Sequence, residues 1–393
     1  MKSASGFRVS GILIAILASI AVLLLGSCSD SGDTVTMPEQ NIVKSTFLTG
    51  FQEVPPKNTG ATGIGTATVT PSTRAITGGV TTTGITGTVA HIHEGPVGVV
   101  SPVIVPMTET PAGSGQWVIA PNTVLTESQF ASFQSGNLYF NVHSTANPVG
   151  EIRGQIGLDV KNVTLTGAQE TPPHATTATG TGILTYKPDT RAISGRVVTT
   201  GIAGIAAHIH TGAVGVLAPV SIPMTQSATD SNTWLIPDGT VLTEAQAASL
   251  VSGGMYYNVH SALYPNGEIR GQIGRVVRYG LLAGVQETPP NGSSASGVGV
   301  AIIEPETRMI FAQTATTGIV GTAAHIHQAP GAIAGGIIVP QSESAPGSGI
   351  WTSASGAALT PSQYDDFFKG NLYFNVHSAA IPGGEIRGQI IVQ

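Results

Sequence analysis

The feature that most constrains this chain is a unit of 117 residues that occurs three times. His91, His208 and His325 are spaced by 117 residues, and tryptophans at positions 117, 234 and 351 keep the same spacing. This period is far above the 20–50 residues of solenoid repeats, and each copy is long enough to bury its own core. The 393-residue chain therefore predicts three domains in series, at 45–157, 158–274 and 275–393.

Composition narrows the class of protein. Charged residues make up 10% of the chain, against about 25% in average proteins. The net charge of −6 argues against a nucleic-acid binder, which needs a basic surface to displace counterions. At 41% hydrophobic residues the chain is too apolar to be disordered. A single cysteine excludes a disulfide framework within the chain and any metal cluster with several cysteines.

The N-terminus has the pattern of an export signal. A basic start is followed by an uncharged, mostly apolar run from Gly11 to Gly26, which is short for a membrane span of about 20 residues. The run ends in Leu-Gly-Ser-Cys28, which resembles the lipobox of bacterial lipoproteins. By this resemblance, residues 1–27 are a signal peptide, Cys28 carries the lipid, and residues 28–44 form a tether. The serine after Cys28 implies the outer membrane if the cell is Gram-negative. The alternative is a plain signal peptide or an uncleaved anchor.

Each copy has the pattern of an all-β domain with one short helix. A helix is expected at 125–133, because Thr126 and Gln129 form a capping-box pair that recurs at 243/246 and 360/363. We predict three tandem Greek-key antiparallel β-sandwich domains. Turn-rich residues separate eight strand candidates in the first copy: 46–51, 63–70, 75–82, 86–93, 99–106, 116–119, 137–143 and 151–156.

Nine of the ten histidines occupy equivalent positions in the three copies. Side chains alternate between the two faces of a strand. In the first copy His91 and His93 therefore point away from the apolar face of their strand, and His143 does the same on a later strand. We expect the three rings to converge outside the core. The equivalent sets are His208, His210 and His260, and His325, His327 and His377.

Two interpretations of these histidines are open. Three neutral imidazoles with an open position form a known zinc arrangement, and imidazole also suits copper. The cofactor would then be copper or zinc, and polar neighbours would orient the rings. The other interpretation is a metal-free network of hydrogen bonds between strands. The candidate orienting residues on the same faces are Asn141, Glu151, Arg153, Asn258, Glu268, Arg270, Asn375, Glu385 and Arg387.

The repeated motifs together resemble the chordin-type (CHRD) domain. These motifs are Ala-His-Ile-His, Asn-Val-His-Ser and Gly-Glu-Ile-Arg-Gly-Gln-Ile, and the resemblance covers residues 41–393. It implies a secreted or surface location rather than a particular activity. The third copy departs from the pattern, because Ala329 replaces the first glycine of the loop after the paired histidines.

A weaker resemblance is to copper/zinc superoxide dismutase, in which paired strand histidines project outside a Greek-key barrel. By that resemblance His91 and His93 match the paired copper ligands and His143 matches a ligand on a later strand. Three histidines per copy cannot fill both metal sites of that family, and one cysteine cannot form its intramolecular disulfide. Dismutase activity is therefore not predicted.

These observations predict a lipid-anchored protein of the bacterial cell envelope that acts as a non-enzymatic binding or surface module. The chain contains no nucleophile elbow, no His-Glu-x-x-His motif and no Asp-rich calcium loop. The expected partners are the membrane, through the lipid at Cys28, and an unknown periplasmic or extracellular ligand, with no nucleic acid. The alternative is a metal-binding protein or metalloenzyme that uses the three histidines of each domain.

Overall fold

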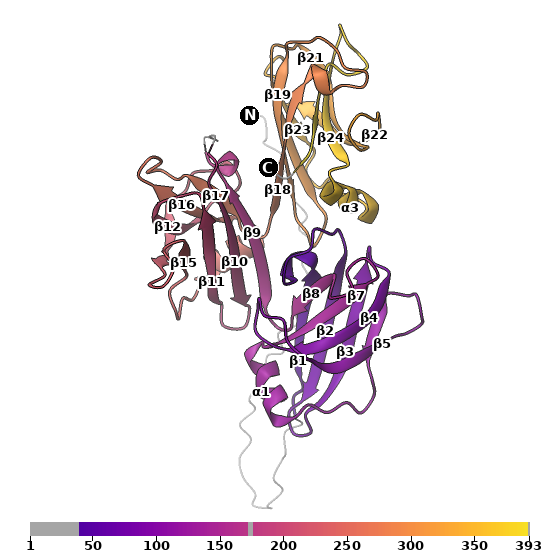
Figure 1. The fold of residues 1–393 in the computed structure, drawn as a ribbon, viewed down its shortest axis with the longest axis vertical. Coiled ribbons are helices and arrows are strands. Elements are labelled where there is room, and N and C mark those ends of the chain that lie inside the picture. The colour runs from indigo at the N-terminus through magenta and orange to yellow at the C-terminus, as the bar shows by residue number, and fades with distance from the viewer. Residues whose placement is uncertain (1–38, 172–175, 392–393) are drawn as a thin grey trace, which may run out of the picture. The chain divides into compact units, whose positions relative to one another are not determined.

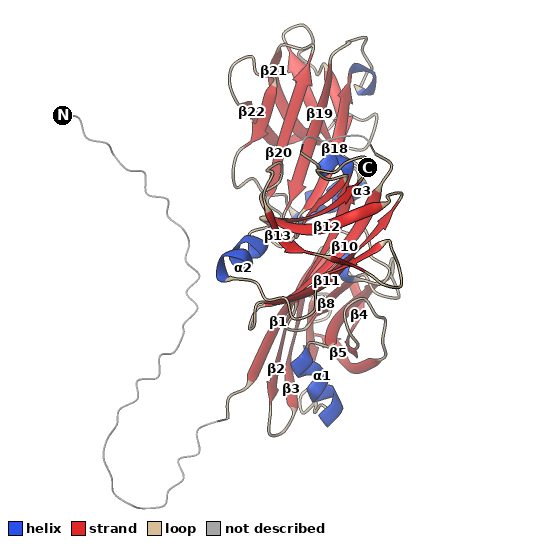
Figure 2. Cartoon of the chain, turned by 90° about the vertical axis from the view of Figure 1, so that its left-hand side faces the viewer, coloured by secondary structure: helices blue, strands red, loops and turns tan. Residues whose placement is uncertain are grey.

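The computed structural model describes residues 39–171 and 176–391. In these ranges the chain forms three antiparallel β-domains with one α-helix each (Figures 1 and 2). The predicted all-β class is therefore confirmed. The predicted signal peptide and Cys28 lie outside the described residues. No helix within the described ranges has both the length and the apolar character needed to cross a membrane.

The first domain is an eight-stranded sheet that closes on itself into a barrel. A 3₁₀ turn, η1 (Gly50–Gln52), follows the first strand, and helix α1 (Glu127–Ser135) precedes the seventh. The strands are β1 (Ile42–Thr49), β2 (Thr62–Thr70), β3 (Ala75–Thr83), β4 (Gly87–Glu94), β5 (Val103–Glu109), β6 (Gln116–Ile119), β7 (Leu138–Ser144) and β8 (Ile152–Gln155).

The order of the strands around the barrel is β1-β2-β3-β6-β5-β4-β7-β8. Strands β4, β5 and β6 follow one another as hairpins, and β7 then returns to pair with β4, which is a Greek key. The predicted Greek-key topology is therefore present. The sheet is closed into a barrel because its two end strands, β1 and β8, pair with each other and β8 also pairs with β7. The pairing of β7 with both β4 and β8 places these three strands side by side, and they carry the residues predicted for the site.

The second domain repeats this arrangement with one strand interrupted. Strands β13 and β14 are separated by Met224 alone and lie at the two ends of the sheet order. Together they take the place of β5, because β13 pairs with β12 and β14 pairs with β15. The elements are β9 (Asp159–Thr166), η2 (Gly167–Gln169), β10 (Thr179–Lys187), β11 (Ala192–Thr200), β12 (Gly204–Thr211), β13 (Val220–Pro223), β14 (Thr225–Gln226), β15 (Thr233–Leu235), α2 (Glu244–Val251), β16 (Met255–Ser261) and β17 (Ile269–Gln272).

The third domain is again a closed eight-stranded barrel with the strand order of the first. Its elements are β18 (Val276–Ala283), η3 (Gly284–Gln286), β19 (Ser296–Ile303), β20 (Ile310–Thr317), β21 (Gly321–Gln328), β22 (Gly336–Glu343), β23 (Ile350–Ser353), α3 (Pro361–Lys369), β24 (Leu372–Ser378) and β25 (Ile386–Gln389).

Each domain encloses its own apolar core. In the first domain the inward side chains of β7 are Leu138, Phe140 and Val142, and all three are fully buried. The ring of Phe140 lies against Gly65 of β2, where a Cβ atom would approach the ring to 2.6 Å. A glycine in this strand therefore leaves the space that the aromatic ring fills. The tryptophan of each copy also belongs to the core, with Trp117 only 4% exposed.

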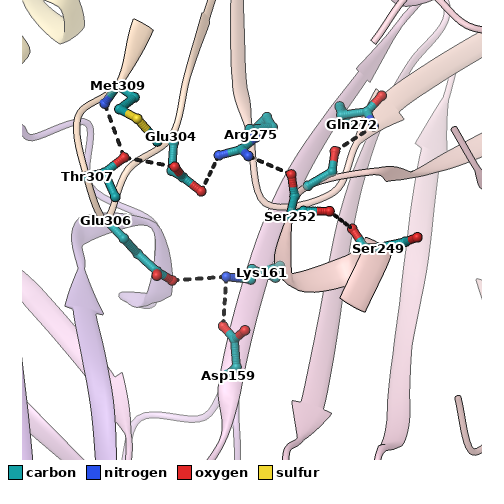
Figure 3. Close-up of polar contacts among 11 residues, drawn as sticks. Asp159, Lys161, Ser249, Ser252, Gln272, Arg275, Glu304, Glu306, Thr307 and Met309 are labelled. Atoms are coloured by element: carbon teal, nitrogen blue, oxygen red, sulfur yellow. Dashed lines mark hydrogen bonds and ion pairs between the residues drawn. The ribbon is translucent and has the colours of Figure 1, made fainter. Parts of the chain in front are cut away.

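The helices begin where the capping boxes predict. Thr126, Thr243 and Thr360 are the N-caps, and each side chain accepts a hydrogen bond from the backbone N–H three residues later. The end of α2 is fastened to the barrel, because Gln272 Nε2 donates to the Gly253 carbonyl over 2.9 Å. Figure 3 shows Gln272 beside Ser249 and Ser252 at this end of the helix.

Two strands of the first domain differ from the sequence prediction by more than one residue at their ends. The first strand begins at Ile42, so it includes residues that the sequence placed in the tether, and it ends before the 3₁₀ turn at 50–52. The fifth strand begins at Val103 rather than at residue 99. The segment between β4 and β5 is instead a loop, residues 95–102, that packs over the outer face of β7 and β8 through bonds described below.

Candidate functional site

The three predicted histidines of the first domain lie together on the outer face of the barrel. In the antiparallel pairing of β4 with β7, His91 is opposite Asn141, His93 is opposite Tyr139, and His143 is opposite Val89. His91 Nδ1 lies 3.3 Å from His143 Nε2. Each of the three rings offers a nitrogen, and these nitrogens all lie within 4.8 Å of one another. The expected convergence is therefore present.

The other two domains repeat the cluster. The corresponding Nδ1–Nε2 distance is 3.1 Å between His208 and His260 and 3.3 Å between His325 and His377. Their ring nitrogens also lie within the same 4.8 Å limit. Three copies that diverged elsewhere in sequence thus keep one arrangement of rings.

Backbone carbonyls hold two of the three rings. His93 Nδ1 donates to the Ser101 carbonyl over 2.7 Å, and His143 Nδ1 donates to the Pro148 carbonyl over 3.1 Å. A carbonyl can only accept, so both rings carry a proton on Nδ1, and in the neutral form their Nε2 is the unprotonated nitrogen. The equivalent bonds run from His210 to Ala218, His260 to Pro265, His327 to Gly335 and His377 to Pro382.

One nitrogen in each cluster is buried without a partner. The Nε2 atoms of His93, His210 and His327 are inaccessible to solvent and have no hydrogen-bond partner within the described residues. Buried polar atoms nearly always have a hydrogen-bond partner, so each exception needs a physical explanation. The same exception occurs at three equivalent positions, as it also does for the Nε1 atoms of Trp117, Trp234 and Trp351.

Burial favours the neutral form of the imidazoles in the first cluster. It lowers the pKa of His91, His93 and His143 below the ordinary value, and a positive charge on His143 would lower the pKa of His91 further. Burial likewise lowers the pKa of His208, His210, His260, His325 and His327. Neutral imidazole is the form that binds a metal ion.

The cluster is close to the dimensions of a metal site. Two nitrogens bound to one zinc ion at about 2.0–2.1 Å in tetrahedral geometry lie about 3.3 Å apart. The pair formed by His91 and His143 has this separation. Across the whole cluster the separations reach at most 4.8 Å, so the third nitrogen would need to approach by up to about 1.5 Å to complete a three-histidine site.

The predicted orienting residues lie close by but serve other partners. Asn141 donates to the carboxylate of Glu53, which follows the 3₁₀ turn. Glu151 accepts hydrogen bonds from Thr59 and from Ser144. The hydrogen bonds that fix the ring tautomers come from main-chain carbonyls. Such bonds leave no side-chain signature in the sequence.

Arg153, the third predicted neighbour, reaches the cluster through an aromatic ring. Its guanidinium carbon lies 3.5 Å from the ring centroid of Tyr139. On the other side of the Tyr139 ring lies His93, whose ring is parallel to that of Tyr139 within 6° at a centroid distance of 4.9 Å. The sequence predicts that Tyr139 lies on the face of the histidines but predicts no role for it. Its recurrence at 256 and 373 was the available signal.

The part of the outer face that carries His93, Tyr139 and Arg153 is covered rather than open to water. His93 is 8% exposed, Tyr139 is 1% exposed and Arg153 is 2% exposed. Alternation along the strands correctly separates the two faces, but it does not show that loop 95–102 folds over the outer one. His91 is the more accessible ring of the cluster and marks its solvent side.

The chain matches the model of one protein family in three places. The CHRD-domain model matches residues 45–156, 161–273 and 280–390. The chain belongs to the CHRD-domain family. No curated protein and no solved structure matches it.

The CHRD matches begin in the first strand of each barrel and end at or just after its last strand. Each CHRD domain therefore contains all the strands of one repeat and one histidine cluster. The third CHRD domain keeps the contacts of its loop despite Ala329, whose carbonyl still accepts from Gln389 Nε2 over 3.0 Å.

Proposed function

We propose that each CHRD domain of this protein binds one copper or zinc ion through its three histidines. The observation that supports this most strongly is the buried, unpartnered Nε2 of His93, His210 and His327. His93 and His143 each present an Nε2 lone pair, because a hydrogen bond from Nδ1–H to a backbone carbonyl fixes the tautomer of each ring. Ligating histidines usually donate their other N–H to such an acceptor.

A purely structural network accounts less well for these atoms. In such a network each ring nitrogen would have a hydrogen-bond partner, and an unsatisfied buried group costs about 1–3 kcal/mol. The structure repeats this cost in all three domains. In the metal-free protein, His91 Nδ1–H donates to His143 Nε2, because the proton of His143 is committed to Pro148. A metal ion would replace that proton and would also give the third nitrogen a partner.

We further propose that the three domains are held at the bacterial cell envelope by a lipid on Cys28. The support is the lipobox-like sequence that ends at the chain's only cysteine. Three metal sites in series would then act at the membrane surface as a binding module with a capacity of three ions per chain. No catalytic role is proposed for the histidines.

The metal proposal predicts a simple stoichiometry. Purified, tag-free protein that starts at Asp30 should bind three equivalents of copper(II) or zinc, measured by calorimetry and elemental analysis. Replacing the three histidines of one domain by alanine should remove one equivalent. The matched control is His174→Ala, which lies outside the repeated positions and should leave three. The proposal would be wrong if the wild type bound no metal, or if every variant lacking the three histidines of one domain still bound three equivalents of metal.

The anchoring proposal is tested separately. Cells grown with labelled palmitate should label the wild-type protein and leave Cys28→Ser unlabelled, and the variant should leave the membrane fraction. A Cys28→Ser protein that keeps its N-terminal segment and stays in the membrane would show an anchor of another kind.

A further inference from the structure

A stack of three side chains lies behind the buried histidine of every cluster. In the first domain the order is His93, Tyr139 and Arg153, taken from adjacent strands β4, β7 and β8. The histidine and tyrosine rings are nearly parallel in all three domains, with centroid distances of 4.9, 4.8 and 5.0 Å. The guanidinium carbon lies 3.5 Å from the tyrosine centroid in each.

The same two residues hold the loop that fixes the histidine. The Tyr139 hydroxyl accepts a hydrogen bond from the backbone N–H of Ser101 over 3.0 Å, and the carbonyl of Ser101 accepts from His93 Nδ1. Arg153 donates to the carbonyls of Val99 and Pro96 at 2.8 and 2.9 Å. Ring and loop are thus fixed together by one tyrosine and one arginine.

The other domains reproduce these bonds with different loop side chains. The tyrosine hydroxyl accepts from Ala218 in the second domain and from Gly335 in the third, at 3.2 and 2.9 Å. The arginine again donates to two loop carbonyls, at 3.1 and 2.7 Å from Arg270 and at 2.8 and 3.0 Å from Arg387. Because each of these bonds is to a main-chain atom of the loop, the arrangement is the same although the loop side chains differ.

We propose that Arg153 and Tyr139 are positioning residues that hold His93 as the Nδ1–H tautomer, so that its Nε2 is ready for a metal ion before the ion arrives. Arg270 with Tyr256, and Arg387 with Tyr373, do the same for His210 and His327. The inference rests on the proposed metal site. Arginine is suited to this role because its flat guanidinium stacks on a ring while its fork of N–H groups reaches two carbonyls, which lysine cannot reproduce.

The test is Arg153→Lys in the three-domain protein, with the two unchanged domains as internal controls. We expect copper(II) or zinc titration to show two sites of wild-type affinity and one site weakened about tenfold or more, as is typical when such outer partners are lost. In the metal-free protein, the imidazole ¹⁵N shifts of His93 should change from one tautomer to a mixture. Arg196→Lys, at an exposed position of β11, is the matched control and should change neither quantity.

A second variant, Tyr139→Phe, tests the inference if the first domain of the Arg153→Lys protein does not fold. Tyr139→Phe keeps the stacked ring but loses the acceptor for the Ser101 N–H, so we expect a smaller loss of affinity and a partial change of tautomer. A lower melting temperature with unchanged tautomer and affinity in the folded variant would overturn the inference. Failure of the wild type to bind metal would instead overturn the proposed function, while the tautomer measurement would still report on the stack.

Discussion

At the scale of single residues, each domain buries a carboxyl group that the metal site does not use. Glu53 is 6% exposed and contacts Asn141, which lies opposite His91 in the sheet. One oxygen of Glu53 and the side-chain oxygen of Asn141 have no hydrogen-bond donor within the described chain. Burial, opposed by the charge of Arg153, raises the pKa of Glu53 to about 7, and burial raises the pKa of Glu170 to about 7 as well.

This burial predicts a pH-dependent stability. A carboxyl group whose pKa is raised by folding stabilises the fold below its ordinary pKa, near 4.5, and that contribution is lost as the pH rises through about 7. Replacing Glu53, Glu170 and Glu287 by glutamine mimics the protonated acid. We expect the free energy of unfolding of this variant, relative to wild type, to increase between pH 5 and pH 8.

The measurement is urea unfolding of both proteins without metal at several pH values. The comparison with wild type is essential, because the lowered pKa values of the histidines act in the opposite direction and destabilise the fold as the pH falls. A difference between variant and wild type that does not depend on pH would show that the carboxyl groups are ionised throughout.

The sequence predicts the histidine cluster because residues two apart on a strand share a face. His91, His93 and His143 are therefore correctly placed together outside the core. The partners that fix the rings could not be predicted in the same way. They are carbonyls of Ser101 and Pro148, and any residue type supplies a carbonyl.

At the scale of elements, the helices are the best predicted parts, since their start depends on local side-chain bonds. In α2 the Thr243 side chain accepts from the Gln246 N–H over 3.2 Å, and Gln246 accepts in return from the Thr243 N–H over 2.9 Å. The fifth strand is predicted less well. Residue 99, the expected start of this strand, belongs instead to the preceding loop, where the Val99 carbonyl accepts a hydrogen bond from Arg153.

Removing one cap should loosen one helix only. Thr243→Ala removes a hydrogen bond that is typically worth about 1 kcal/mol, so amide exchange in α2 should accelerate about fivefold. Helices α1 and α3 of the same chain serve as internal controls, and Thr243→Ser should retain slow exchange. Equal protection of α2 in the alanine and serine variants would mean that packing of Leu250 and Ala247 alone holds the helix.

At the scale of the whole molecule, each CHRD domain satisfies the requirements of an independent folding unit. The three apolar cores draw their buried residues from 48–156, 163–273 and 282–390, without overlap. The last strand of each domain pairs with strands of the same domain, as β17 does with β16 and β9. The 117-residue period predicts three separate cores, because a copy of this length can bury a core of its own.

A fragment of residues 158–274 should therefore fold alone. Trp234, its single tryptophan, is 4% exposed in the core and provides the fluorescence probe. We expect its emission and the far-UV circular dichroism to change in one coincident transition in urea, as for other small domains. The fragment should also bind one equivalent of copper(II) or zinc if the proposed site is correct.

A shorter fragment, 158–266, is the matched control. It lacks β17, which pairs with both β16 and β9 and supplies the buried Ile269. Without this strand the sheet has two unpaired edges and an opened core, so the shorter fragment should be molten or aggregated. Similar cooperative unfolding of the two fragments, or aggregation of the longer one, would contradict independent folding. Aggregation of the longer fragment would point to strands exchanged between neighbouring copies.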